Sequence, residues 1–223
     1  MQNHSGDKKL LIFLLRHGQP AFPDARPYLY GHTDYPLSET GKQEAEKLGR
    51  ALAGVEMQRV VSSDLRRALE TAEIACRFQR DAPNIEIDPR LREIHMGEWD
   101  GIPKEEVAEK FSELFARRGN DITSVCAPGG ESFEELQIRA ISALENIAET
   151  SAGLERVLLV AHGGLFWTIV SGLFDIPLSH MTRFGLDYCA LHLLERSSAR
   201  GWRLIRYNWS PDLADYMDYP IPV

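Results

Sequence analysis

The chain has 223 residues, of which 43% are hydrophobic and 26% charged, and its formal net charge is −8. This length and composition suit one large α/β domain with a sizeable buried core, and they exclude a disordered chain. The acidic balance argues against a general surface for nucleic acid or anionic membrane, so we expect neither as a partner.

The first predicted elements are a strand, a long loop and a helix. The apolar run at 10–15 is continuous, which is typical of a parallel strand buried on both faces. Residues 19–36 hold four of the twelve prolines and form a long loop, a feature that is often functional in compact domains. Ser38 is the expected N-cap of a helix that includes 43–52 and is closed by Gly54.

A second strand and a second helix follow. Residues 58–62 predict a short strand. Ser63 or Asp64 is expected to cap the next helix, over 65–75, whose apolar residues recur at helical spacing. A further short strand is expected within 81–90.

The middle of the chain is predicted to be mostly helical. A loop over 91–101 leads to an amphipathic helix over 103–117. The Pro-Gly-Gly sequence at 128–130 breaks the chain before a long helix over 131–150. We interpret 102–130 as a helical lid inserted into a single domain.

The last third of the chain completes the predicted sheet. Residues 156–161 predict a second buried strand, which is apolar from Val157 on, and a helix over 165–173 follows it. Two strands, 188–195 and 202–207, close the fold before an aromatic, proline-containing tail at 208–223. Because strands alternate with helices, we predict an α/β three-layer sandwich with a mostly parallel central sheet flanked by helices.

Cysteine usage and the apolar segments predict where the protein resides. The three cysteines are Cys76, Cys126 and Cys189, and their odd number and wide spacing favour a reducing compartment. The run at 10–15 is too short for a signal peptide, and the longest apolar segment, 157–174, is interrupted by a His-Gly-Gly sequence. We therefore predict a cytoplasmic protein without membrane spans, and we leave its oligomeric state open.

Two of the predicted strands end in the same dipeptide. His17-Gly18 follows the first apolar run, and His162-Gly163 follows the second. If both strands are central in one parallel sheet, they end at one edge and their two imidazoles lie within reach of each other. A single histidine after a strand is more often a packed or capping residue, so the prediction rests on the pair.

Arginines add positive charge at the same edge. Arg16 precedes the first histidine, and Arg66-Arg67 lies in the helix that follows the strand at 58–62. A helix start favours anions, and a guanidinium offers a bidentate fork to phosphate. An isolated arginine pair on a helix is usually solvated. Together with the two histidines, however, these arginines predict a small cationic bowl for a compact oxyanion such as phosphate.

Six short blocks carry these residues in a fixed order along the chain. They are Arg16-His17-Gly18, Gly31 to Gly41, Ser62 to Ala72, Leu91 to Gly101, Gly130-Glu131-Ser132 and Ala161 to Gly164. In this order they resemble the signature blocks of the histidine phosphatase superfamily, which has a phosphoglycerate-mutase-like fold. The resemblance covers about residues 10–210 and makes Arg67 the second phosphate-binding arginine.

The resemblance implies roles for the residues of the bowl. His17 is the expected nucleophile, which becomes phosphorylated on its ring, and Glu93 is the expected acid that protonates the leaving alcohol. The implied catalytic set is His17, Glu93, His162, Arg16 and Arg67. The implied phosphate-binding set is Arg16, His17, Gln19, Arg67, His162 and Gly163. No metal ion or cofactor is expected.

The chain departs from the family's pattern at two places. Pro23 stands where many members carry an asparagine that contacts phosphate. The Tyr- and Lys-containing segment with which mutases grip a carboxylated sugar phosphate is missing, because the chain runs directly through 99–103. Its absence favours water as the phosphoryl acceptor, and therefore a phosphatase.

We predict a metal-independent phosphomonoesterase that acts on a small phosphorylated metabolite through a phosphohistidine. The alternatives are a phosphoglycerate-type mutase, a catalytically silent module that binds phosphorylated ligands, and a metallohydrolase. The metallohydrolase is disfavoured because Arg16 and Arg67, beside the candidate ligands, would repel a divalent cation. Sugar phosphates, ribosyl phosphates and phosphoserine all remain open as substrates. Residues expected to meet the organic moiety are Tyr28, Tyr30, Phe111, Phe115, Arg117 and Arg118, although an Arg-Arg pair is more often a solvated face.

Overall fold

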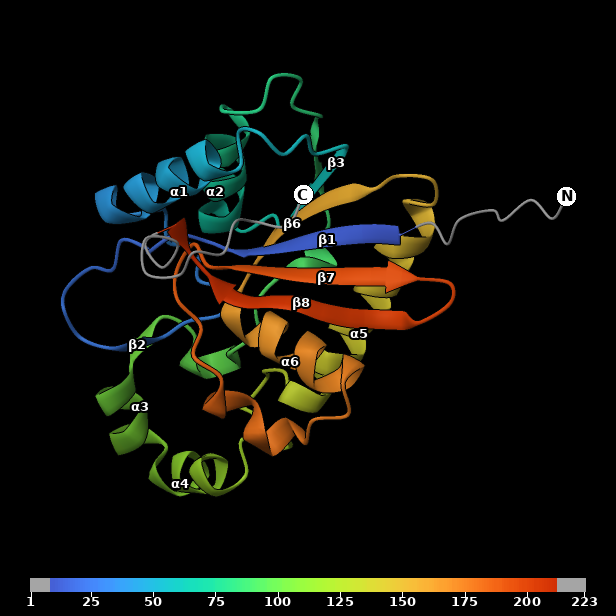
Figure 1. The fold of residues 1–223 in the computed structure, drawn as a ribbon. Coiled ribbons are helices and arrows are strands. Elements are labelled where there is room, and N and C mark those ends of the chain that lie inside the picture. Colours follow the sequence, from blue (N-terminus) through green and yellow to red (C-terminus); the bar gives the residue numbers. More distant parts are fainter. Residues whose placement is uncertain (1–8, 212–223) are drawn as a thin grey trace, which may run out of the picture.

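The computed structural model describes residues 9–211, which fold around a six-stranded sheet (Figure 1). Its strand order is β4-β3-β6-β1-β7-β8. The strands are β1 (Lys9–Arg16), β3 (Arg59–Ser62), β4 (Ile85–Ile87), β6 (Arg156–Ala161), β7 (Leu191–Ser197) and β8 (Gly201–Trp209). Strand β7 pairs antiparallel with β1 and with β8, and the other described neighbouring pairs of this sheet are parallel. The predicted mostly parallel sheet is confirmed.

Helices cover both faces of this sheet, as Figure 1 shows. On one face lie α1 (Glu39–Ala51) and α2 (Arg66–Cys76), and on the other lie α5 (Phe133–Thr150) and α6 (Gly163–Leu173). The predicted three-layer α/β sandwich is confirmed. Within residues 9–211, no helix combines the length and apolarity needed to cross a bilayer.

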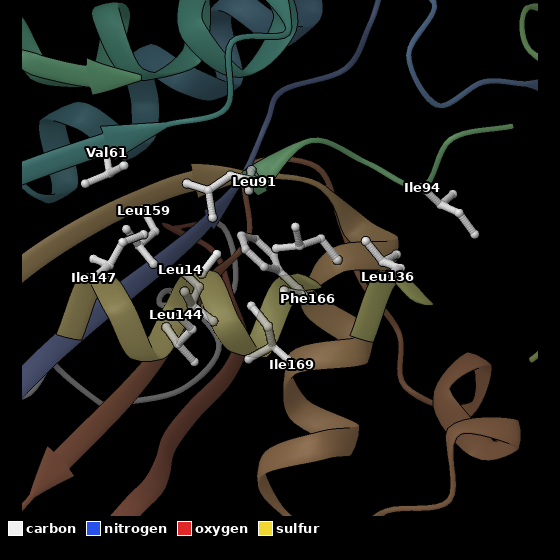
Figure 2. Close-up of a cluster of buried hydrophobic side chains, with 14 of the residues drawn as sticks. Leu14, Val61, Leu91, Ile94, Leu136, Leu144, Ile147, Leu159, Phe166 and Ile169 are labelled. Carbon is white, nitrogen blue, oxygen red and sulfur yellow. The ribbon is translucent and has the colours of Figure 1, made fainter. Parts of the chain in front are cut away.

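Strand β1 shows why its apolar run has no polar alternation. Phe13 and Leu15 pack in the cluster under α1 and α2, whereas Ile12 and Leu14 pack in the cluster under α5 and α6. Figure 2 shows Leu14 among side chains of α5 and α6, including Phe166. Burying each such side chain stabilises the fold by about 1.5–3 kcal/mol. The strand that carries Arg16 at its end is therefore rigidly held.

The remaining elements lie between β1 and α1 and between β4 and α5, apart from one turn after α6. They are β2 (Tyr28–Leu29), β5 (Ile102–Pro103), α3 (Lys104–Lys110), α4 (Ser112–Asn120) and the short 3-10 turns η1 (Pro89–Leu91), η2 (Gly97–Trp99) and η3 (Leu178–Arg183). Strand β2 pairs with β5, so the long loop after β1 is tied to the segment predicted as a lid. The lid function itself stays a prediction.

Some local predictions were wrong. The single helix over 103–117 is broken at Phe111, which leaves helical dihedral angles (φ −121°, ψ 38°) and packs 6.0 Å from the ring of Trp99. Ser38 caps α1 as predicted, but the helix ends at Ala51 rather than at Gly54. Helix α5 begins at residue 133, after a capping box formed by Ser132 and Glu135.

Helix α2 lacks the side-chain cap that the sequence predicts. Its N-cap residue is Leu65, which makes no side-chain capping bond. Asp64 accepts a hydrogen bond from Arg92 (2.7 Å), and Ser63 contacts His162 (2.9 Å). Both expected capping residues are therefore committed to tertiary contacts near the strand ends.

The C-terminal prediction is only partly covered by the structure. Asn208 and Trp209 of the predicted tail belong to β8. The rest of the tail, from residue 212 on, lies outside the described residues. The closing strands begin and end a few residues from the predicted positions, but they form the expected adjacent pair.

Candidate active site

The two His-Gly strand ends meet at one edge of the sheet. Strands β1 and β6 are adjacent and parallel, with Arg16 opposite Ala161. A histidine directly follows each strand, and the ring centroids of His17 and His162 lie 5.0 Å apart. The backbone N–H of His17 also donates to the carbonyl of Ala161 (3.0 Å). The structure thus brings the two imidazoles together.

His17 is buried, with 1% of its surface exposed, and its tautomer follows from one contact. The carbonyl of Gly18 can only accept, so Nδ1 carries the proton and donates to it (2.7 Å). That leaves a lone pair on Nε2. Burial lowers the pKa of His17 well below its ordinary value of 6.5, and the charges of Arg67 and Arg16 lower it further. His17 is therefore a neutral imidazole near pH 7.

Arg67 lies in the first turn of α2 and is fully buried (0% exposed). Its Nε donates to Nε2 of His17 (3.3 Å). Its two terminal nitrogens donate to main-chain carbonyls, one to Gly31 (2.6 Å) and one to Thr33 (3.0 Å). No carboxylate is among these partners, so the guanidinium keeps its positive charge available to an anion beside His17.

Asp100 organises the turn that holds Arg67. One carboxylate oxygen accepts from the N–H groups of Gly31 (2.9 Å) and Thr33 (3.1 Å) and from the Thr33 hydroxyl (2.7 Å), and the other accepts from the N–H of His32 (2.7 Å). Burial alone would raise the pKa of Asp100, but these hydrogen bonds hold it below its ordinary value. The peptide between Gly31 and His32 therefore donates to Asp100 and accepts from Arg67.

Sequence reasoning missed Asp100. The residue lies inside the block that carries Glu93, between Trp99 and Gly101, and its carboxylate contacts the block that begins at Gly31. The sequence signal was an aspartate between Trp99 and Gly101 in a predicted loop. Its spacing from the block at Gly31 did not indicate that the two segments would form hydrogen bonds.

Among residues 9–211, Arg16 and His162 each have a buried side-chain nitrogen without a hydrogen-bond partner. Arg16 donates from one terminal nitrogen to the carbonyl of Leu186, and its guanidinium carbon lies 4.1 Å from the centroid of the Tyr188 ring. Its Nε is buried and makes no hydrogen bond to any group that the structure describes. Buried polar groups normally have partners, so the open nitrogen indicates a place for an acceptor.

His162 is fully buried (0% exposed), and the pKa of its ring is lowered mainly by burial and then by Arg67 and His17. Its Nε2 lies 2.9 Å from the hydroxyl of Ser63, which already accepts from the N–H of Leu65 (3.3 Å). A hydroxyl that donates to Nε2 leaves the proton of His162 on Nδ1. That nitrogen has no hydrogen-bond partner within residues 9–211.

Glu93 reaches the same edge from the loop before η2. One oxygen accepts from the N–H of Ile94 (2.9 Å) and the other from the N–H of Gly164 (2.9 Å), in the first turn of α6. A Cβ on Gly164 would lie 2.5 Å from the carboxylate, so any larger residue at this position would displace Glu93. The structure therefore brings the expected acid to the first turn of α6, the helix that His162 caps.

Gly163 and Gln19 are the two other predicted phosphate contacts. Gly163 lies beside Arg16, whereas Gln19 is bound to α1 and the residue before it. Gly163 starts α6, and a Cβ there would lie 3.3 Å from Nε of Arg16, so the glycine leaves room around that nitrogen. Gln19 is held by its main chain, which donates to Glu44 (2.9 Å) and accepts from the N–H of Ser38 (2.9 Å). These bonds fix its backbone against the start of α1.

Two tyrosines cover the bowl. The hydroxyls of Tyr30 and Tyr188 lie 3.1 Å apart. The Tyr188 ring centroid is 5.7 Å from that of His17, and the guanidinium carbon of Arg67 is 5.1 Å from the centroid of the Tyr30 ring. The sequence predicted Tyr30 but gave no signal for Tyr188, which precedes β7 and lies far from the other residues along the chain.

Several residues predicted to meet the organic moiety contact the ring of Trp99, and their role towards a substrate stays a prediction. Phe111 and Phe115 lie 6.0 and 5.8 Å from the Trp99 ring. Arg118 lies over the same buried ring at 6.0 Å, and Arg117 is exposed on α4. These side chains pack on Trp99 within the segment predicted as a lid. Their helical spacing in the sequence reflects this packing.

The geometry brings a neutral imidazole, two guanidinium groups and a carboxylate to one edge of the sheet. Over the described residues, no three His, Cys, Asp or Glu side chains form a group that could hold a metal ion. The two guanidinium groups and the helix start at α6 instead favour a compact oxyanion.

Comparisons with known proteins bear on the family and the fold of the chain. The model of the histidine phosphatase superfamily (branch 1) matches residues 12–210. A Photorhabdus laumondii protein named probable phosphoglycerate mutase GpmB is 32% identical over 202 residues, covering 86% of this chain and 90% of that protein. The mycobacterial glucosyl-3-phosphoglycerate phosphatase structure has a TM-score of 0.79 and 26% identity, over 91% of this chain and 100% of the other. The α-ribazole phosphatase of Shigella flexneri has a TM-score of 0.80 and 23% identity, over 90% and 96%, which shows the shared fold.

Proposed function

The chain belongs to the histidine phosphatase superfamily, and from that membership we propose that it hydrolyses a small phosphomonoester through a phosphohistidine on His17, without a metal ion. The observation that carries the proposal is the pair of buried, unpartnered nitrogens, on Arg16 and His162, beside a neutral histidine within the described residues. A phosphoryl group would supply the acceptors that these nitrogens lack.

In the first step, Nε2 of His17 attacks phosphorus, and the bond from phosphorus to the alcohol oxygen breaks. Glu93 enters this step in its protonated form, gives its proton to that oxygen and becomes the carboxylate, and the free alcohol leaves. The contact from Nε of Arg67 to Nε2 of His17 is long (3.3 Å), and phosphoryl oxygens offer Arg67 a stronger acceptor. Substrate binding therefore frees the lone pair that attacks.

In the second step, water attacks phosphorus and Glu93 takes a proton from it. The bond from phosphorus to Nε2 breaks, and His17 returns to the neutral state with inorganic phosphate as the product. Arg16, Arg67 and His162 contact the phosphoryl oxygens through both steps and stabilise the charge of the transition state.

A phosphoglycerate-type mutase is the second candidate, because a relative that shares 32% of its sequence bears that name. Such an enzyme returns the phosphoryl group to an organic acid instead of to water. Hydrolysis is favoured by the missing mutase segment at 99–103, and a solved structure at 26% identity is that of a phosphatase.

The test is a screen of phosphorylated metabolites for phosphate release by the wild type, His17→Ala and His180→Ala. His180 lies in η3 and serves as the matched control for loss of an imidazole. We expect release that persists in chelator, is unchanged in His180→Ala and is abolished in His17→Ala. An acid-labile phosphoenzyme should form only when His17 is present. Isomerised product without net phosphate release would instead support the mutase.

A further inference from the structure

Four aromatic side chains gather in the loop after β1. We call Phe22, Tyr28, Tyr30 and Tyr35 the aromatic wall. The ring of Phe22 stacks on Tyr28 at 5.9 Å and meets Tyr30 and Tyr35 edge-on at 5.1 and 5.4 Å. Each of the four residues is only partly buried. The four rings therefore pack against one another, and part of their surface is exposed to solvent.

The aromatic wall begins at the catalytic bowl. Tyr30 lies over the guanidinium of Arg67, and the next residue, Gly31, packs so closely on Ile94 that a Cβ would lie 1.9 Å from its carbonyl oxygen. His32 contacts the carbonyl of Glu93 through Nε2 (3.0 Å). The wall therefore starts beside the residue that protonates the leaving group, which is where the organic part of the substrate must lie.

Charges around the aromatic wall are already paired within the chain. Arg26, 5.8 Å from the Tyr28 ring centroid, bonds to Asp24 (3.0 Å) and Glu106 (2.7 Å). Arg66 bonds to Glu70 (2.6 Å), and Arg92 bonds to Asp64 (2.7 Å). A carboxylate on the substrate would have to compete with these partners, whereas an apolar ring would not.

We propose that the aromatic wall binds the leaving group, and that the substrate is a phosphomonoester whose alcohol carries an aromatic ring and no carboxylate. The proposal rests on the proposed hydrolysis at His17 and adds the class of alcohol. Ring contacts supply the attraction, and the acidic partners of the arginines disfavour a second anionic group.

The test compares three substrates with alkyl leaving groups: 2-phenylethyl phosphate, ethyl phosphate and 3-phosphoglycerate. For the wild type we expect the highest kcat/KM with 2-phenylethyl phosphate and the lowest with 3-phosphoglycerate. Phe22→Leu keeps an apolar side chain but removes the ring. It should lower kcat/KM for 2-phenylethyl phosphate by about 3- to 10-fold and leave ethyl phosphate unchanged. Phe22→Tyr, which keeps the ring, should retain the preference.

Each outcome separates this proposal from the proposed function. Release from all three esters at equal kcat/KM, or a preference for 3-phosphoglycerate, overturns the aromatic specificity while hydrolysis stands. An equal loss in Phe22→Leu on both esters that lack a carboxylate also overturns it, because a folding defect does not select between substrates. Release from none of the three by a wild type that is active in the metabolite screen overturns the aromatic specificity, whereas inactivity in the screen as well overturns the proposed hydrolysis.

Discussion

Replacing Asp100 by asparagine tests whether a carboxylate outside the bowl positions Arg67. The substitution keeps the size of the side chain but turns one acceptor oxygen into an NH2 donor. In the better of the two amide orientations, the remaining oxygen keeps the three bonds from Gly31 and Thr33. The NH2 group then faces the N–H of His32, which donates to Asp100 at 2.7 Å in the wild type.

The loss falls on the peptide that also holds Arg67. A hydrogen bond to a charged group contributes about 1.5–3 kcal/mol, which corresponds to a factor of roughly 10 to 150. The peptide that loses this bond presents the Gly31 carbonyl to Arg67. We therefore expect kcat/KM to fall about tenfold or more in Asp100→Asn, with the phosphohistidine still formed.

The matched control is Asp121→Asn. Asp121 also accepts several hydrogen bonds, from Thr123 and Ser124, in an exposed turn after α4. Its replacement should leave kcat/KM unchanged. The effect of Asp100→Asn should also shrink in an Arg67→Lys background, because the two residues act as one unit. Full activity in Asp100→Asn, or an equal loss in both backgrounds, would refute the reasoning.

Three further predictions follow from the same contacts. Glu93→Gln should lower kcat for an alkyl phosphate by about 10²–10⁴-fold but much less for 4-nitrophenyl phosphate, whose leaving group needs no proton; equal losses would count against Glu93 as the acid. Gly164→Ala should reproduce that substrate dependence, because its Cβ would lie 2.5 Å from the Glu93 carboxylate; unchanged kinetics would show that Glu93 acts elsewhere. Burial, followed by the charge of Arg16, lowers the pKa of His192 to about 3, so this ring takes up a proton only on unfolding as the pH falls below 6.5. Titration of this ring therefore does not lower the free energy of unfolding above pH 6.5. Below pH 6.5 it does, by about 2 kcal/mol between pH 7.5 and about pH 5. Urea unfolding of His192→Phe should show a pH dependence that is smaller by that amount, and an identical slope would contradict the assignment.

Much of the fold could be predicted because its strongest patterns are local. The run at 10–15 is buried on both faces, so it contains no alternation, and its end at Arg16 marks the edge of the sheet. The second run, at 156–161, has the same form. Two such strands in one parallel sheet end at the same edge, and this rule alone placed His17 near His162.

Contacts between distant segments could not be predicted from the same patterns. Helical spacing continues through Phe111, yet the chain breaks there because the ring packs on Trp99. Tyr188 covers His17 from the loop before β7, where no motif marks it. Asp100 reaches its turn through four hydrogen bonds that depend on how two loops fold against each other.

The way the two kinds of charge are held explains why the bowl stays ready for an anion. Arg67 is bound by main-chain carbonyls, with Asp100 acting on it through one peptide, so no carboxylate neutralises it directly. Glu93 is bound by the N–H groups of Ile94 and Gly164, so it is not drawn into an ion pair with the arginine. A direct pair would satisfy both groups, and it would exclude the phosphoryl oxygens from Arg67 and hold the Glu93 carboxylate away from the leaving alcohol. Separating the two charges with backbone dipoles leaves each available for its own step. Under the proposed function, this separation explains how an acidic chain, with a net charge of −8, maintains a site for phosphate.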